Sequence, residues 1–188
     1  NQFINYIREK YKTRHLDGVL GTHDGPESLV AAILARHFGL PGMDPANALV
    51  CEHKYYSREA QKKIVPFAVP QFQHLAIDGL TRDDINLSYP FFVKPVKSAF
   101  SMLARPSDRF ETLEAYLPKV RSQLARQSLP AFNVLLETYS ALELDASRLI
   151  AEEVLDGAQV TVEGFSWNGR VSIMGITDSV MYPGTMSF

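Results

Sequence analysis

Residues 149–164 read Leu-Ile-Ala-Glu-Glu-Val-Leu-Asp-Gly-Ala-Gln-Val-Thr-Val-Glu-Gly, and this stretch decides the fold. An apolar run closes on two acidic residues, Glu152 and Glu153, which predicts a short strand with a charged end. A glycine follows at Gly157, and apolar residues then alternate with polar ones over 159–165, which predicts a second strand. The acidic pair therefore lies at a junction between two strands, where backbone groups and carboxylates are both offered to a ligand.

A second apolar strand lies upstream, at residues 89–95, Tyr-Pro-Phe-Phe-Val-Lys-Pro. The two-residue period of a strand places Phe92 and Lys94 on one face and Phe91 and Val93 on the other. A lysine on a buried strand needs an anionic partner, because an unpaired buried charge is costly. We infer that Lys94 meets phosphate oxygens, with a lysine that extends to water as the alternative. On the first hypothesis, the two segments form the two sides of a nucleotide clamp.

Composition narrows the class of protein. The chain has 188 residues, 46% hydrophobic and 21% charged, which is typical of one or two globular domains rather than of a disordered segment. The net charge of −2 gives no reason to expect nucleic acid or an anionic membrane as partner. The single cysteine, Cys51, excludes an internal disulfide and fits a reducing compartment. No apolar run approaches the ~20 residues of a membrane span. We therefore predict a cytoplasmic location.

The first part of the chain predicts a small α/β domain. Residues 2–13 match an amphipathic helix, and 17–22 match a short buried strand of the kind found in parallel sheets. A turn leads into a helix that ends at Gly39. Residues 46–63 predict a further helix. The chain begins without methionine and ends soon after a turn, so we expect a fragment of a longer protein.

The rest predicts an α+β domain. Residues 107–126 match an amphipathic helix that Pro118 should kink or split. The strand over 159–165 and another over 170–176 are joined by Trp-Asn-Gly at 167–169, a strong signal for a tight hairpin turn. The predicted fold class is therefore α/β plus α+β.

Four further polar side chains are candidates for phosphate binding. Lys54 and Arg58 are neighbours at helical spacing, and an anion would relieve their mutual repulsion. The alternative is a solvated basic helix face. Ser98 and Ser101 follow Lys94 on a loop without glycine, so they offer hydroxyl donors but no glycine-rich cradle. An ordinary turn is equally compatible with this loop.

The acidic and amide residues leave several readings open. Glu152 and Glu153 point to opposite faces of a strand, so one of them at most reaches a given ligand. Gln159 and Glu163 share a face with Thr161 and suit sugar hydroxyls or a plain surface. The histidines and the cysteine show no metal-ligand spacing, and we predict no metal-binding residue in this chain.

Taken in order, these segments resemble the ATP-grasp superfamily, and within it the carboxylate–amine ligases that act on amino acids. Residues 53–58 resemble its Asp-Lys-x-x-x-Arg helix, with His53 in place of the aspartate. Residues 89–95 resemble its Tyr-Pro-hydrophobic-Val-Lys-Pro strand, and 152–157 resemble its adenine hinge. Further pieces of the match lie at 17–22, 40–42 and 160–165.

The resemblance implies roles for particular residues. Lys54 and Lys94 bind the ATP phosphates, and Glu152 approaches the amino edge of adenine. The backbones of Glu153 and Leu155 hydrogen-bond the purine. Gln159 occupies the ribose position, where the family often has glutamate. With the two loop serines, the implied ATP-binding set is Lys54, Lys94, Ser98, Ser101, Glu152, Glu153, Leu155 and Gln159.

The resemblance also implies a domain plan. Residues 1–71 are a partial N-terminal (pre-ATP-grasp) α/β domain, 72–153 the ATP-grasp lid subdomain, and 154–188 the truncated start of the C-terminal antiparallel sheet. The Mg²⁺ ligands of the family are expected beyond Phe188.

The implied activity is ATP-dependent ligation of a small-molecule carboxylate to an amine through an acyl phosphate, with ATP and Mg²⁺ as cofactors and no activity expected from this fragment alone. A homodimer is a further hypothesis. Two alternatives stay open: a non-catalytic nucleotide-binding or regulatory module, and a biotin-carboxylase-like enzyme.

Overall fold

The computed structural model describes residues 2–23, 25–127 and 129–183. The chain divides into two compact units, Asn1–Glu153 and Val154–Phe188, which we describe separately. No helix in the described ranges is long and apolar enough to cross a membrane.

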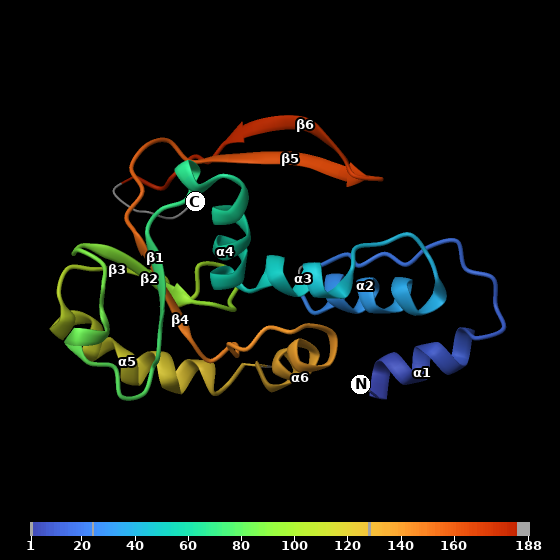
Figure 1. The fold of residues 1–188 in the computed structure, drawn as a ribbon, viewed down its shortest axis with the longest axis horizontal. Coiled ribbons are helices and arrows are strands. Elements are labelled where there is room, and N and C mark those ends of the chain that lie inside the picture. The colour runs from blue at the N-terminus through green and yellow to red at the C-terminus, as the bar shows by residue number, and fades with distance from the viewer. Residues whose placement is uncertain (1, 24, 128, 184–188) are drawn as a thin grey trace. The chain divides into compact units, whose positions relative to one another are not determined.

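The first unit contains a four-stranded antiparallel sheet, which lies on the side of α5 and away from α1 and α2 (Figure 1). Its strands run in the order β1-β4-β2-β3, so β4 is hydrogen-bonded on both edges, to β1 and to β2. The four strands are β1 (Phe72–Leu75), β2 (Phe91–Pro95), β3 (Arg105–Ser107) and β4 (Leu149–Glu153). Four of the five residues of β4 are buried, as its central place requires, and Glu153 is exposed. The strand predicted from the opening stretch is therefore confirmed, and it is the middle of the sheet.

The register between β2 and β4 sets the position of the charged residues. Phe92 lies directly opposite Glu152, which makes Lys94 a diagonal neighbour of that carboxylate on the same face. Phe91 and Val93 point to the other face and are fully buried. The predicted alternation along this strand is confirmed.

Helices α5 (Phe110–Leu124) and α6 (Leu129–Tyr139) bury their apolar stripes in the same core as β2 and β4. We predicted that Pro118 kinks or splits the first of these helices. It does not split it, because α5 is a single helix over all 15 residues. Pro118 and Glu114 both lie on the exposed face, so the carbonyl that loses its hydrogen bond is open to water.

Four helices precede the sheet, with two short 3₁₀ turns, η1 (Pro66–Ala68) and η2 (Arg82–Asp84), after them. The helices are α1 (Gln2–Tyr11), α2 (Glu27–Phe38), α3 (Pro45–Glu52) and α4 (Lys54–Ile64). The predicted end of α2 at Gly39 is confirmed, with that glycine in the left-handed conformation.

Two sequence predictions in this part are wrong. Residues 17–22 form no strand: they pair with no described strand, and the Leu20 side chain is 93% exposed. A strand is stable only beside another strand, and the pattern of this segment cannot supply one. The helix predicted over 46–63 is two helices, because the backbone at His53 is extended.

The second unit contains one hairpin, β5 (Val160–Trp167) paired with β6 (Arg170–Asp178). The predicted Asn-Gly turn is confirmed, since Asn168 and Gly169 both have positive φ. A register shift lies at Glu163/Gly164. A side chain on Gly164 would come within 2.4 Å of the Ser172 carbonyl oxygen, so only glycine fits this close approach.

Candidate nucleotide-binding site

His53 ends α3 and begins α4, and it positions the charged residues that follow. Its ring is fully buried. Nδ1 accepts a long hydrogen bond from the Tyr56 amide at 3.5 Å, and Nε2 lies 3.3 Å from the Asp145 carbonyl oxygen. The neutral tautomer with hydrogen on Nε2 satisfies both contacts. Burial lowers the pKa of His53, which favours that neutral form. Histidine therefore caps this helix as an aspartate would.

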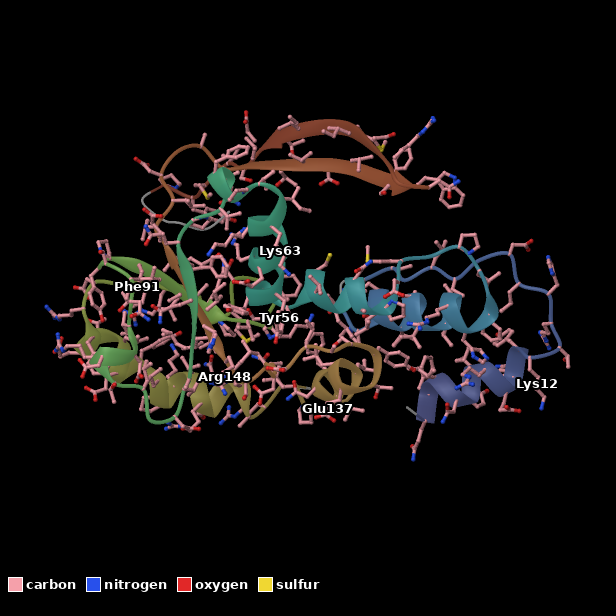
Figure 2. All side chains as sticks on the ribbon, in the orientation of Figure 1. Lys12, Tyr56, Lys63, Phe91, Glu137 and Arg148 are labelled. Carbon is pink, nitrogen blue, oxygen red and sulfur yellow. The ribbon has the colours of Figure 1, made fainter. Side chains whose placement is uncertain are left out.

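Tyr56 fastens the first turn of α4 to the segment that leads into β4 (Figure 2). Its hydroxyl oxygen accepts hydrogen bonds from the amides of Glu143 and Leu144, at 2.9 and 2.7 Å. With the cap at His53, this contact gives the start of α4 two anchors, so the side chains on its first turns have defined positions.

Lys54 is held against the chain that leaves β2. Its amide donates to the Val96 carbonyl at 2.8 Å, and its Nζ donates to the Ser98 carbonyl at 2.7 Å and to the Ser98 hydroxyl at 3.2 Å. No carboxylate in the described part of the chain forms an ion pair with Lys54. Burial, with the nearby charges of Lys94 and Lys97, lowers its pKa to about 8.

Glu152 lies between two cations. Its Oε1 accepts from Arg58 Nε at 2.5 Å, and its Oε2 pairs with Lys94 Nζ. Burial opposes ionisation of this carboxyl, but Lys94 and Arg58 outweigh burial and hold its pKa below the usual range. The anionic partner expected for Lys94 is, in this structure, Glu152.

Lys97 completes the group. It forms an ion pair with Glu52 at 2.5 Å, and Ser28 donates to the same carboxylate at 2.8 Å. Its Nζ also lies 5.0 Å from the centre of the Phe132 ring. We call Lys54, Arg58, Lys94 and Lys97 the cation cluster. Three of the four pair with two carboxylates, Arg58 and Lys94 with Glu152 and Lys97 with Glu52. Lys54 is the member that donates to oxygen atoms of uncharged groups.

The structure brings together four of the eight predicted ATP-binding residues: Lys54, Lys94, Ser98 and Glu152. Ser101 belongs to the same loop, is exposed and has positive φ. The Glu153 side chain points away from Glu152, and its amide donates to the Gln71 carbonyl at 2.9 Å. The amide of Glu153 is thus already bonded at the edge of the sheet. Leu155 and Gln159 lie in the second unit and are exposed.

The sequence does not predict the partners of Arg58 and Lys97. Helical spacing makes Arg58 a neighbour of Lys54, yet its buried contact is with Glu152. The Lys97–Glu52 pair joins positions 45 residues apart with no shared pattern. Spacing signals a contact within one helix, but it carries no signal for pairs across elements.

Within the described ranges, no three histidine, cysteine, aspartate or glutamate side chains lie together as a metal site would require. The Mg²⁺ implied by the resemblance therefore has no ligand set among these residues, and we derive no step through it.

Solved structures of other proteins share the fold of this chain. No protein-family model and no curated protein matches the chain. Among solved structures, the L-amino acid ligase from Bacillus licheniformis superposes over 94% of this chain with a TM-score of 0.65 and 22% sequence identity. The chain has the fold of the ATP-grasp carboxylate–amine ligases.

Two other ATP-grasp structures agree. The D-alanine–D-alanine ligase from Bacillus anthracis complexed with ATP matches over 94% of this chain, with a TM-score of 0.51 and 13% identity. The phosphoribosylglycinamide synthetase from Anaerococcus prevotii matches over 97%, with a TM-score of 0.51 and 20% identity. The chain spans 36%, 57% and 40% of the lengths of these three proteins, in the order given. The fold predicted from the ordered motifs is confirmed.

Proposed function

We propose that this chain carries the ATP-binding front half of an ATP-dependent carboxylate–amine ligase that works through an acyl phosphate. The observation that carries the proposal is the meeting of Lys54, from the start of α4, with Lys94, from β2. Burial lowers the pKa of Lys54 to about 8, and the nearby charges of Lys94 and Lys97 add to this effect, which places both lysines close to Lys54. Like charges are costly to hold together, and a polyphosphate is the ligand that offsets this cost.

The ion pairs allow Lys94 to change partner. A buried carboxylate left without a cation would be strongly destabilising. Glu152 keeps Arg58 at 2.5 Å when Lys94 leaves it, so Lys94 can turn to a phosphate oxygen without that penalty. Arg58 thus leaves Lys94 free to bind a phosphate, and Lys54 can bind one without breaking an ion pair.

In the proposed reaction, an oxygen of the substrate carboxylate attacks the γ-phosphorus of ATP and ADP leaves. The amine then attacks the acyl carbon and phosphate leaves. The cations neutralise the phosphates and hold the transferring group in line with the carboxylate. Purine contacts from the backbones of Glu153 and Leu155, and a ribose contact from Gln159, remain predictions within this proposal.

Two lysine variants test the proposal in the intact protein that contains this chain. We expect Lys94→Ala to weaken ATP binding at least about tenfold, which is about 1.4 kcal/mol, when measured by calorimetry. Lys97→Ala is the matched control, because Lys97 is held by Glu52 and Phe132. Equal losses in the two variants would count against the assignment of Lys94.

A turnover assay separates the proposal from its alternatives. ADP formation from ATP that requires both a carboxylate and an amine supports the ligase. ATP binding without ADP formation across a panel of amino acids supports a non-catalytic module. ADP formation that requires bicarbonate supports a biotin-carboxylase-like enzyme.

A further inference from the structure

A hollow of about 780 Å³ lies among α1, α2, the first turn of α3 and the end of α6, and shares no residue with the cation cluster. We call it the α1–α2 pocket. Its polar lining includes Arg8 from α1, and Arg36 and His37 from the end of α2. The volume falls within the range of small-molecule sites.

Arg8 is oriented by an uncharged group. Its Nε donates to His37 Nε2 at 3.1 Å, so the imidazole acts as acceptor and brings α1 and α2 together through their polar ends. One amino nitrogen of the guanidinium reaches Asn5 Oδ1 at 3.5 Å, the outer limit of a hydrogen bond. Arg8 makes no ion pair with a carboxylate in the described ranges. The nearby Glu9 carboxylate interacts with the charge of Arg8, but its ion pair is with Lys12. The guanidinium of Arg8 is therefore held in place without a carboxylate bound to it.

Arg36 is only loosely neutralised. Its Nη1 lies 3.5 Å from Asp44 Oδ2, longer than the usual 2.7–2.9 Å of a charge-assisted hydrogen bond. The other oxygen of Asp44 accepts from the Ala46 amide at 2.8 Å and caps α3. Asp44 is thus committed to the helix, and most donors of Arg36 are left for another acceptor.

The remaining wall is mixed. Ile4 and Ile33 line the hollow and are 5% and 3% exposed, so they are firmly packed rather than a mobile rim. The end of α6 adds Thr138 and Ser140, whose hydroxyls donate to backbone carbonyls of that helix. Two guanidinium groups in a hollow that also has aliphatic side chains match a molecule with an anionic head and a short hydrocarbon part.

We propose that the α1–α2 pocket binds a small organic anion, with its carboxylate or phosphate group held by Arg8 and Arg36 and its short apolar part against Ile4 and Ile33. The planar fork of each guanidinium fits either head group in a two-pronged arrangement. This site shares no residue with the cation cluster, although α3 and α6 line it and also contact Lys97 through Glu52 and Phe132.

Two probes test the proposal and distinguish the head groups. Isovalerate carries a carboxylate on a branched apolar body, and isobutyl phosphate carries a phosphate on a similar body. Each is titrated into the protein and followed by calorimetry and by the ring proton signals of His37. We expect saturable binding of at least one probe, with a shift of the His37 signals, because His37 touches Arg8.

The variant Arg36→Gln should weaken that binding at least about tenfold. It removes an exposed side chain, so the fold should survive, and far-ultraviolet circular dichroism verifies this. Arg126→Gln is the matched control, an exposed arginine that does not line the hollow. Lys54→Met should leave probe binding unchanged while it weakens ATP binding, which separates this site from the proposed function.

Three results would overturn the proposal. The first is no binding of either probe at concentrations of about 10 mM, which corresponds to an affinity far weaker than that of typical small-molecule sites. The second is equal binding by the wild-type protein and Arg36→Gln. The third is loss of binding in Lys54→Met. The last result would assign the probes to the ATP site.

Discussion

Lys54, which we propose binds phosphate, lowers the stability of the unliganded protein. Burial, with Lys94 and Lys97 nearby, lowers its pKa from 10.5 to about 8. Between these two pH values the unfolded chain binds more protons at this site than the folded one. The free energy of unfolding therefore rises with pH across this window. At neutral pH, the charged lysine lowers the free energy of unfolding, and a bound phosphate would raise it again.

We predict that Lys54→Met raises the free energy of unfolding of the unliganded protein at pH 7. The variant should also flatten the rise in stability between pH 8 and pH 10. Urea denaturation at several pH values measures both effects. Lys63→Met is the control, because Lys63 is exposed at the end of the same helix (Figure 2). A destabilised Lys54→Met protein at pH 7 would contradict the prediction.

Glu152, in contrast to Lys54, stabilises the unliganded protein. Its carboxylate balances Arg58 and Lys94, and its pKa lies below the ordinary 4.5 because these cations outweigh its burial. A lowered folded-state pKa means that the contribution to stability is present above about 4.5 and is lost as the pH falls through the folded value.

We predict that Glu152→Gln lowers the free energy of unfolding at pH 7 by about 3 kcal/mol, because two half-buried cations lose their shared partner. Glu153→Gln should change it by less than about 0.5 kcal/mol, since that side chain is exposed on the opposite face. Denaturant titration of the pair measures the difference. Similar losses in both variants would show that Glu152 is not the balancing charge.

At the element scale, local chemistry explains the helix ends and the hairpin. The α3–α4 break at His53 separates two helical patterns that run together in sequence. The hairpin depends on glycine at one point, where Gly164 passes close to the Ser172 carbonyl. Gly175, on the paired strand, has open space around it.

We predict that Gly164→Ala disrupts pairing of β5 with β6, while Gly175→Ala leaves it intact. The added methyl of the first variant would overlap a backbone oxygen that cannot move without breaking the register. Hydrogen exchange of the hairpin amides measures the effect, with exchange at least about tenfold faster expected in Gly164→Ala. Equal exchange rates in the two variants would contradict the importance of this close approach.

At the scale of the whole molecule, the proposed binding of ATP is coupled to protonation of Lys54. A phosphate beside Lys54 favours its charged form and raises its pKa above about 8. At pH 8, where about half of this lysine is uncharged before binding, the proposed complex must take up protons.

We predict net proton uptake on ATP binding at pH 8, less uptake at pH 7, and weaker binding as the pH rises above 8. Calorimetry in buffers with different ionisation enthalpies counts the protons. ATP itself exchanges protons near pH 7, so Lys54→Met provides the reference. Identical uptake by wild type and Lys54→Met would remove Lys54 from the phosphate site.

The sequence by itself determined the elements whose stability is local. Apolar runs at 89–95 and 149–153 predicted two strands, Asn168 and Gly169 predicted a hairpin turn, and Gly39 predicted a helix end. Backbone conformation and side-chain period are properties of a few adjacent residues, so they can be read without the rest of the chain. The order of the motifs then sufficed to predict the fold.

Only the tertiary structure decided which charges meet. Antiparallel pairing of β2 with β4 brings Lys94 beside Glu152, and α4 adds Arg58 from 94 residues away. The tertiary structure also decided that residues 17–22 form no strand and are mostly exposed, since no neighbouring strand is placed beside them. Coulombic and hydrogen-bonding partners depend on distance in space, and separation along the chain does not encode that distance.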